Sequence, residues 1–184
     1  MSGSAQQQLA WRYGVCPLES PSDRFGSFSE LVSLWRARRP AGAVLPPRAG
    51  LDFYDLTGWL GRIFIAEVTC APFSLRYRLW GTELTAWWGV DYTGRTLGDQ
   101  ARNPDLWRLV EFSYFEEMAR APFIGVAAGR LDQHDRPDIK VMSVDLPLGE
   151  PGGRLTHVLC AHALISLDAE PETLIPDLPV VRWV

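Results

Sequence analysis

Cys160 and His162 are the two residues whose types and spacing come closest to catalytic chemistry. A thiolate beside an imidazole is the arrangement that nucleophilic cysteine enzymes use. The two residues stand two positions apart in an apolar run typical of a strand, so their side chains share one face and lie about 7 Å apart at Cα. Parallel side chains at that separation meet poorly, and we therefore do not expect a catalytic pair.

The histidines and cysteines form no metal-binding pattern. His157 and His162 lie five residues apart, so they point to opposite faces of a regular strand and do not ligate one ion together. One of them should face the interior, and we favour His162, on the face of Cys160. Cys16, Cys70 and Cys160 are odd in number and widely scattered, without zinc spacing. We expect neither a metal site nor a disulfide framework.

Composition limits the classes of function. The chain has 184 residues, of which 47% are hydrophobic, with a net charge of −4 and a pI near 5.4. This size predicts one globular domain with a real core. The acidic balance opposes nucleic-acid binding, which needs a basic face. No apolar run is long enough to span a membrane, and the N-terminus has no signal-peptide pattern. We expect a cytoplasmic protein without membrane contacts.

Hydrophobic periodicity predicts the elements that position these residues. The expected helices cover residues 28–39, 82–88 and 103–120, and the expected strands cover 63–70, 73–80, 124–131, 139–148 and 155–166. Strands grouped at both ends with helices between them predict an α+β domain, with a five-stranded antiparallel sheet and helices covering one face. We expect residues 1–27 to be a loosely held arm, 28–167 the domain and 168–184 an extended tail.

Residues 73–95 are rich in aromatic packing surface and poor in reactive groups, which favours recognition over chemistry. Strict alternation along 73–80 places Tyr77 and Trp80 on opposite faces. We predict a ligand pocket lined by Tyr77, Trp87, Trp88, Phe112, Phe115, Met142, Cys160 and His162. Apolar walls with few polar groups suit a small planar ligand. A filled core would use the same residues, so both interpretations stay open.

Two further groups of residues have structural interpretations. Arg78 and Asp91 are expected to pair across the turn and anchor the loop, with the guanidinium forking onto the carboxylate. Leu31, Leu34 and Trp35 form an apolar stripe at helical spacing. This stripe would either cap the sheet or form a dimer face.

The order of elements and four segments resemble the PAS domain family, in particular a compact bacterial subfamily. The segments are LPPRAGLDFYDL at 45–56, RYRLWGTEL at 76–84, GVDYTGR at 89–95 and PLGEPGGRLTHVL at 147–159. The resemblance covers roughly residues 28–167. It implies a sensory or interaction module, with a small ligand or cofactor held between the sheet and the helices.

The resemblance to the PAS family does not identify a cofactor. Flavin-binding photosensory members carry an asparagine–cysteine–arginine motif, whereas Asn103 is followed here by Pro104. Haem-binding members place an axial histidine on the central helix, and His134, His157 and His162 all lie outside it. Both cofactors are therefore disfavoured, and the cofactor stays unknown.

The expected function is a PAS-like module of bacterial signal transduction with no catalysis of its own. Family members usually sit beside an output domain, for which 184 residues leave no room. The module would bind a small apolar ligand or a signalling protein, and we expect a homodimer. One alternative is an enzyme of cone-like α+β fold that uses His162 at a cavity floor. Another is a pure interaction module with a filled core.

Overall fold

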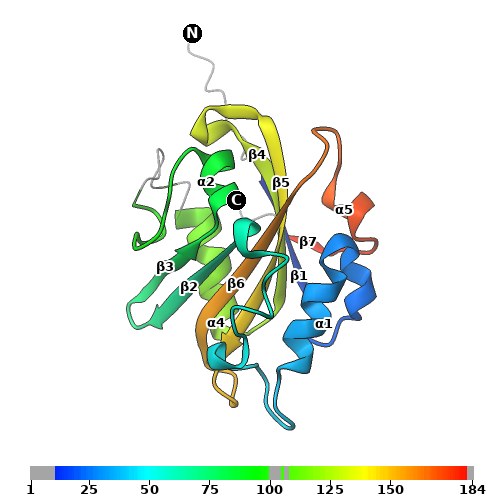
Figure 1. Ribbon diagram of the computed structural model, residues 1–184, viewed down its shortest axis with the longest axis vertical. Helices are drawn as coiled ribbons and strands as arrows, with labels where there is room; N and C mark the ends of the chain where they lie inside the picture. Colours follow the sequence, from blue (N-terminus) through cyan, green and yellow to red (C-terminus); the bar gives the residue numbers. More distant parts are fainter. Residues whose placement is uncertain (1–10, 100–104, 106–107, 182–184) are drawn as a thin grey trace.

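The computed structural model describes residues 11–99, 105 and 108–181. Its centre is a seven-stranded antiparallel sheet in the order β3-β2-β6-β5-β4-β1-β7 (Figure 1). The strands are β1 (Trp11–Cys16), β2 (Ile63–Cys70), β3 (Phe73–Trp80), β4 (Ile124–Leu131), β5 (Arg136–Gly149), β6 (Leu155–Leu164) and β7 (Val180–Val181). The predicted α+β class is confirmed. The five expected strands correspond to β2–β6, and β1 and β7 are additional.

β1 lies within the segment that we expected to be a loose arm. It pairs with β4 along its whole length, from Trp11 opposite Gly129 to Cys16 opposite Ile124. The following 3-10 segment η1 (Ser22–Phe28) buries Phe25 and Phe28. The described part of residues 1–27 is therefore integrated into the domain. Short sequence patterns missed β1 because its partner strand lies more than a hundred residues away in the chain.

Helices lie on both sides of the sheet, not on one as expected. Figure 1 shows α2 (Thr82–Trp88) and α4 (Ser113–Arg120) on one side and α1 (Ser29–Ala37) on the other. The reason lies in the central strands, because residues 124–129 of β4 and 141–149 of β5 are buried on both faces. Two apolar faces require two covering layers. The first part of the helix expected over 103–120 falls largely outside the described residues.

α1 caps the sheet with the stripe that we also considered as a dimer face. Leu31 and Trp35 are fully buried, and Leu34 is half-buried. Trp35 Nε1 donates a hydrogen bond of 2.9 Å to the carbonyl oxygen of Pro147 in β5. The dimer-face interpretation is corrected, because a buried indole with its donor satisfied inside the protomer is not available to a partner.

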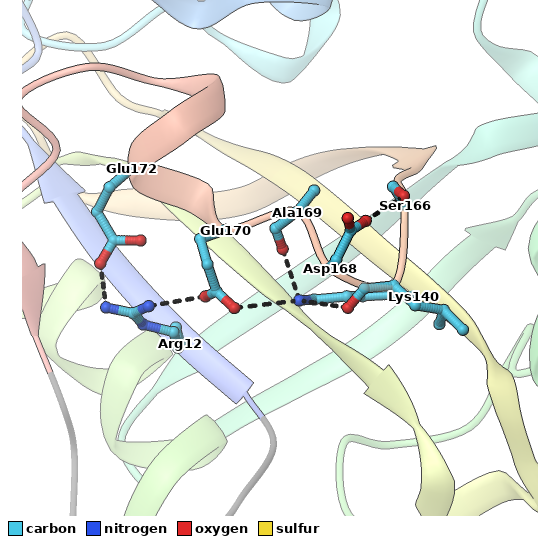
Figure 2. A network of polar contacts seen from close by, with 8 residues as sticks. Arg12, Lys140, Ser166, Asp168, Ala169, Glu170 and Glu172 are labelled. Carbon is cyan, nitrogen blue, oxygen red and sulfur yellow. Dashed lines mark hydrogen bonds and ion pairs between the residues drawn. The ribbon is translucent and has the colours of Figure 1, made fainter.

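The C-terminal segment folds back onto the domain. It carries the short helix α5 (Pro171–Leu174) and then β7, which pairs with β1. Figure 2 shows Arg12 of β1 between Glu170 and Glu172. Lys140 of β5 donates to the carbonyl oxygens of Leu167 and Ala169, at 3.3 and 2.6 Å. The segment expected to be an extended tail is thus attached to two strands of the sheet.

Candidate functional site

A cavity of about 130 Å³ lies between the sheet and the layer of α2, α4 and the π-helical segment η4 (Arg108–Phe112). Nine aromatic side chains line it: Trp11, Tyr13, Phe64, Tyr77, Trp80, Trp88, Tyr92, Tyr114 and Phe115. Polar groups at its surface include Glu111, Ser143, Asp145 and His162. Aromatic walls with a few converging polar groups are typical of small-molecule sites.

A β-bulge brings Tyr77 and Trp80 to the same cavity. Ala66 of β2 pairs with Tyr77 and Phe64 pairs with Trp80, so Arg78 is the extra residue of β3. The bulge shifts the alternation by one residue, which turns Trp80 toward the side of Tyr77. The strict alternation expected from the sequence placed these two rings on opposite faces. Their ring centroids lie 5.3 Å apart, edge to face.

Trp80 is the centre of the aromatic wall. Its ring stacks on Phe64 at 5.5 Å and meets Trp88 edge to face at 5.6 Å. Tyr92 lies 4.8 Å away. The indole is only 8% exposed, and its Nε1 has no hydrogen-bond partner among the described residues. A buried donor without a partner costs about 1–3 kcal/mol. A bound molecule that accepts a hydrogen bond from this atom would remove that cost.

Asp145 is a buried acid at one side of the cavity, with 2% of its surface exposed. It accepts hydrogen bonds from Tyr114 Oη at 2.6 Å and from Ser143 Oγ at 2.9 Å. Burial raises the pKa of Asp145, and the bonds from Tyr114, Cys160 and Ser143 oppose that rise. The charged form of this carboxyl is therefore costly but well solvated by donors.

Glu111 is a second acid at the cavity and comes from the π-helical segment η4. Desolvation, with a smaller contribution from the charge of Asp145, raises the pKa of Glu111 to about 7. This side chain therefore changes its charge near neutral pH. π-Helical segments often occur at functional sites.

His162 lies in the wall beside the aromatic cluster, 5.3 Å from the ring of Trp88 and 5.6 Å from that of Phe64. It is 4% exposed, and its Nδ1 has no hydrogen-bond partner among the described residues. Burial lowers the pKa of His162 to about 3, and the backbone of Arg62 offsets part of this effect. The imidazole is neutral at physiological pH and offers one donor and one acceptor.

Four of the eight predicted pocket residues line the cavity: Tyr77, Trp88, Phe115 and His162. The structure places the other four elsewhere. Trp87 is half-buried beside Trp88, and Phe112 packs edge to face on Phe73 at 4.8 Å. Met142 points to the opposite face of the sheet, because its neighbour Ser143 occupies the cavity face of β5.

Cys160 shares the face of His162 but lies in the core beside Asp145 rather than in the cavity wall. Burial and the nearby charge of Asp145 raise the pKa of the Cys160 thiol. A thiol with a raised pKa is a poor nucleophile. The geometry thus gives no support to a Cys160–His162 pair.

The expected pair of Arg78 and Asp91 does not form between these two described side chains. Arg78 Nε instead donates to Glu67 Oε2 of the neighbouring strand at 2.7 Å. Asp91 Oδ1 accepts from the backbone N–H of Thr93 at 2.8 Å and shapes its own loop. The bulge at Arg78 explains the change, because it alters the direction of the side chain relative to a regular strand.

Sequence reasoning missed the two acids of the site. Asp145 stands alone in the apolar run VMSVDLPL, two residues after Ser143, and such an isolated acid in a buried strand is a detectable signal. Glu111 gave no comparable signal within the expected helix. Among the described residues, no group of three or more His, Cys, Asp or Glu is arranged to hold a metal ion. No described helix is long and apolar enough to cross a membrane.

Comparison with known proteins identifies one family. A PAS domain model matches residues 24–159, which is most of the chain. None of the curated proteins and none of the solved structures that were compared matches the chain. The matched range runs from η1 into β6 and contains Trp80 and its neighbouring rings, Glu111 and Asp145, whereas β1, β7 and His162 lie outside it. On this match and this fold, the chain belongs to the PAS domain family.

Proposed function

We propose that this protein is a sensory module of bacterial signal transduction that binds a small molecule in its aromatic cavity and has no catalytic activity. PAS domains are sensory or interaction modules, and that general role follows from the family match. The observation that carries the ligand-binding role is the pair of buried polar atoms without partners, Trp80 Nε1 and His162 Nδ1, on side chains that line one cavity.

Buried donors and acceptors in folded proteins nearly always have partners, and each exception costs about 1–3 kcal/mol. Two such atoms around one cavity of about 130 Å³ are satisfied together when a polar molecule enters. In an interaction module with a filled core, the two unpartnered polar atoms would only reduce stability.

The test is native mass spectrometry of the purified protein, with a near-ultraviolet and visible absorbance spectrum. We expect an additional mass that is lost on denaturation and reduced in Trp80→Phe. Trp87→Phe is the matched control, because Trp87 is a neighbouring tryptophan that does not line the cavity. A protein without additional mass that also gives no thermal shift with any member of a metabolite library would refute the ligand-binding role.

An enzyme that uses the same cavity is the second candidate, and one observation favours it. The pKa of Glu111 at about 7 is suited to general acid–base catalysis, and His162 lines the same cavity. Turnover of a bound small molecule that is lost in Glu111→Gln would favour the enzyme over the sensor.

The homodimer, a signalling protein partner and the cytoplasmic location stay predictions. A dimer would have to use a surface other than the buried residues Leu31 and Trp35. Analytical ultracentrifugation tests the dimer directly.

A further inference from the structure

The chemistry of the cavity wall favours one class of ligand. The rings of Trp80, Trp88, Tyr77 and Tyr92 line the same small volume, and aromatic rings carry negative electrostatic potential at their faces. Cages of this kind attract organic cations through cation–π interactions, most strongly at tryptophan. An apolar wall alone would suit a neutral ligand equally well. The charged groups of the wall therefore decide between a cationic and a neutral ligand.

Two carboxyl groups, Glu111 and Asp145, belong to the same wall. Arg130 is the one guanidinium among the described lining residues, and its side chain is exposed. His162 is neutral because of its burial. Among the described residues, no basic side chain forms an ion pair with Glu111 or Asp145, so these acids have negative charge to offer to a ligand. A cation in the cavity would compensate this charge.

The unpartnered atoms add a second and independent requirement. Trp80 Nε1 is a donor only, whereas His162 Nδ1 is an acceptor, because the other nitrogen of the neutral ring donates to the backbone of Arg62. A hydroxyl or carbonyl oxygen on the ligand would satisfy Trp80. The cavity is therefore suited to a cation that also carries an oxygen atom.

Size limits the ligand further. An engineered apolar cavity of about 150 Å³ holds one benzene molecule. The cavity here, at about 130 Å³, fits a molecule of about the size of benzene. A single alkylammonium group with a short hydroxylated arm meets this limit, whereas flavin and haem exceed it.

We infer that the cavity binds a small alkylammonium ion, with its cationic group against the aromatic faces and the carboxyls of Glu111 and Asp145. This inference rests on the proposed ligand-binding function and names its ligand class. β1 adds Trp11 and Tyr13 to the wall from outside the matched family range.

Isothermal titration calorimetry with choline and with its neutral isostere 3,3-dimethylbutan-1-ol tests the inference. The two probes differ in charge and hardly in shape. We expect choline to bind about tenfold more tightly or better, which is the scale of a desolvated cation–π contact. Tetramethylammonium, which lacks the hydroxyl group, should bind more weakly than choline.

Variants separate charge from shape. Glu111→Gln should weaken choline binding about tenfold and leave the neutral alcohol unaffected. The matched control is Glu117→Gln, which removes an acid of α4 that pairs with Arg120 outside the cavity. Trp80→Leu should abolish binding of both probes while Trp87→Leu preserves it. If Trp80→Leu does not fold, the Glu111 comparison still decides the question.

The outcomes distinguish the two proposals. Equal affinity for choline and its neutral isostere, or equal choline affinity in Glu111→Gln and wild type, would overturn the alkylammonium inference and leave a ligand-binding cavity. Absence of binding by choline and tetramethylammonium at millimolar concentrations would also overturn it. A neutral or anionic molecule in the native mass spectrum would then retain the proposed function with another ligand class.

Discussion

Tyr114 of α4 donates a hydrogen bond of 2.6 Å to Asp145 of β5 in the interior of the protein. The bond joins the helical layer to the centre of the sheet at the edge of the cavity. Both side chains are almost completely buried. A charge-assisted bond of this kind is short and strong, and loss of its donor leaves a buried carboxyl poorly solvated.

Tyr114→Phe should lower the free energy of unfolding by about 1–3 kcal/mol, because it removes this donor and leaves Asp145 with fewer partners. Urea denaturation followed by tryptophan fluorescence measures the loss. Tyr54→Phe is the control, since Tyr54 is 86% exposed and should show no change. Equal stability of the Tyr114 and Tyr54 variants would mean that the bond contributes nothing to folding.

Gly125→Ala should destabilise the protein by about 1–3 kcal/mol or more, as overpacking of a core does. A Cβ atom at Gly125 would lie 1.7 Å from Tyr114 Oη and would force the phenol away from Asp145. Thermal unfolding measures the effect. Gly152→Ala is a suitable control, because a Cβ atom there meets nothing within 4 Å.

A double variant makes the steric origin of this loss testable. The nearest atom to the new Cβ after Oη is Tyr114 Cζ at 2.8 Å, so removal of the hydroxyl relieves the closest contact. Gly125→Ala combined with Tyr114→Phe should therefore lose less stability than the sum of the single changes. Simple additivity would show that the two residues act independently.

Local sequence patterns predicted much of the fold. The bounds of β2, β3 and α2 agree with the expected ranges, since β-branched residues, Pro72, Gly81 and Gly89 mark them within a few positions. Gly89 ends α2 with a φ of 72°, a conformation that favours glycine. β1 and the bulge at Arg78 were missed, because both depend on pairing between strands rather than on the pattern of one strand.

The same distinction explains the candidate site. Tyr77, Trp88 and His162 followed from aromatic density and alternation, and they line the cavity. Met142 was assigned to the wrong face because one strand alone does not fix which of its two faces meets the helices. The pairing of β5 with β6 fixes it and places Ser143 opposite His162. The acids Glu111 and Asp145 were missed because acidic residues usually lie at the surface.

Stability should fall as the pH rises toward 7, because of Glu111. Its folded pKa of about 7 exceeds the ordinary value of 4.5, so the folded state holds the proton more tightly than the unfolded state. The stabilising effect is complete below the unfolded pKa and is lost as the pH rises through the folded pKa. The loss amounts to at most about 3 kcal/mol.

The groups around Glu111 define the control for this pH effect. Asp145 of β5 also has a raised pKa and contributes with the same sign. Tyr13, Tyr77, Tyr92 and Tyr114 face the same region, and raised pKa values keep them neutral in this range. Glu111→Gln should flatten much of the dependence in denaturation experiments across this pH range, and Glu117→Gln should preserve it. An unchanged slope in Glu111→Gln would assign the effect to Asp145.

Ligand affinity should respond to pH in the opposite direction. An alkylammonium ion interacts best with the ionised form of Glu111, so choline affinity should increase as the pH rises through about 7. The increase should be about tenfold between the protonated and ionised forms and should be absent in Glu111→Gln. Calorimetry at several pH values measures it, with the neutral alcohol as the probe that should show no trend.

β1 connects the cavity to the C-terminal segment through alternate residues. Trp11 and Tyr13 line the cavity, and Gly14 packs under Leu178. Arg12, which lies between Trp11 and Tyr13, binds Glu170 and Glu172 (Figure 2). Exposed ion pairs are individually weak, so Arg12→Ala should cost only about 0.5–1 kcal/mol of global stability. Its main effect should be local, as faster backbone hydrogen exchange in residues 167–181.

Hydrogen-exchange mass spectrometry can examine both ends of this connection. Arg12→Ala should accelerate exchange in 167–181 and leave β5 and β6 protected. The control is Arg154→Ala, which breaks an exposed ion pair with Glu150 and should leave exchange in 167–181 unchanged. Choline should slow exchange in the same segment if occupancy of the cavity tightens β1. Slower exchange confined to α2 and η4 would instead place the response to the ligand in the helical layer. The C-terminal segment would then stabilise β1 without responding to the ligand.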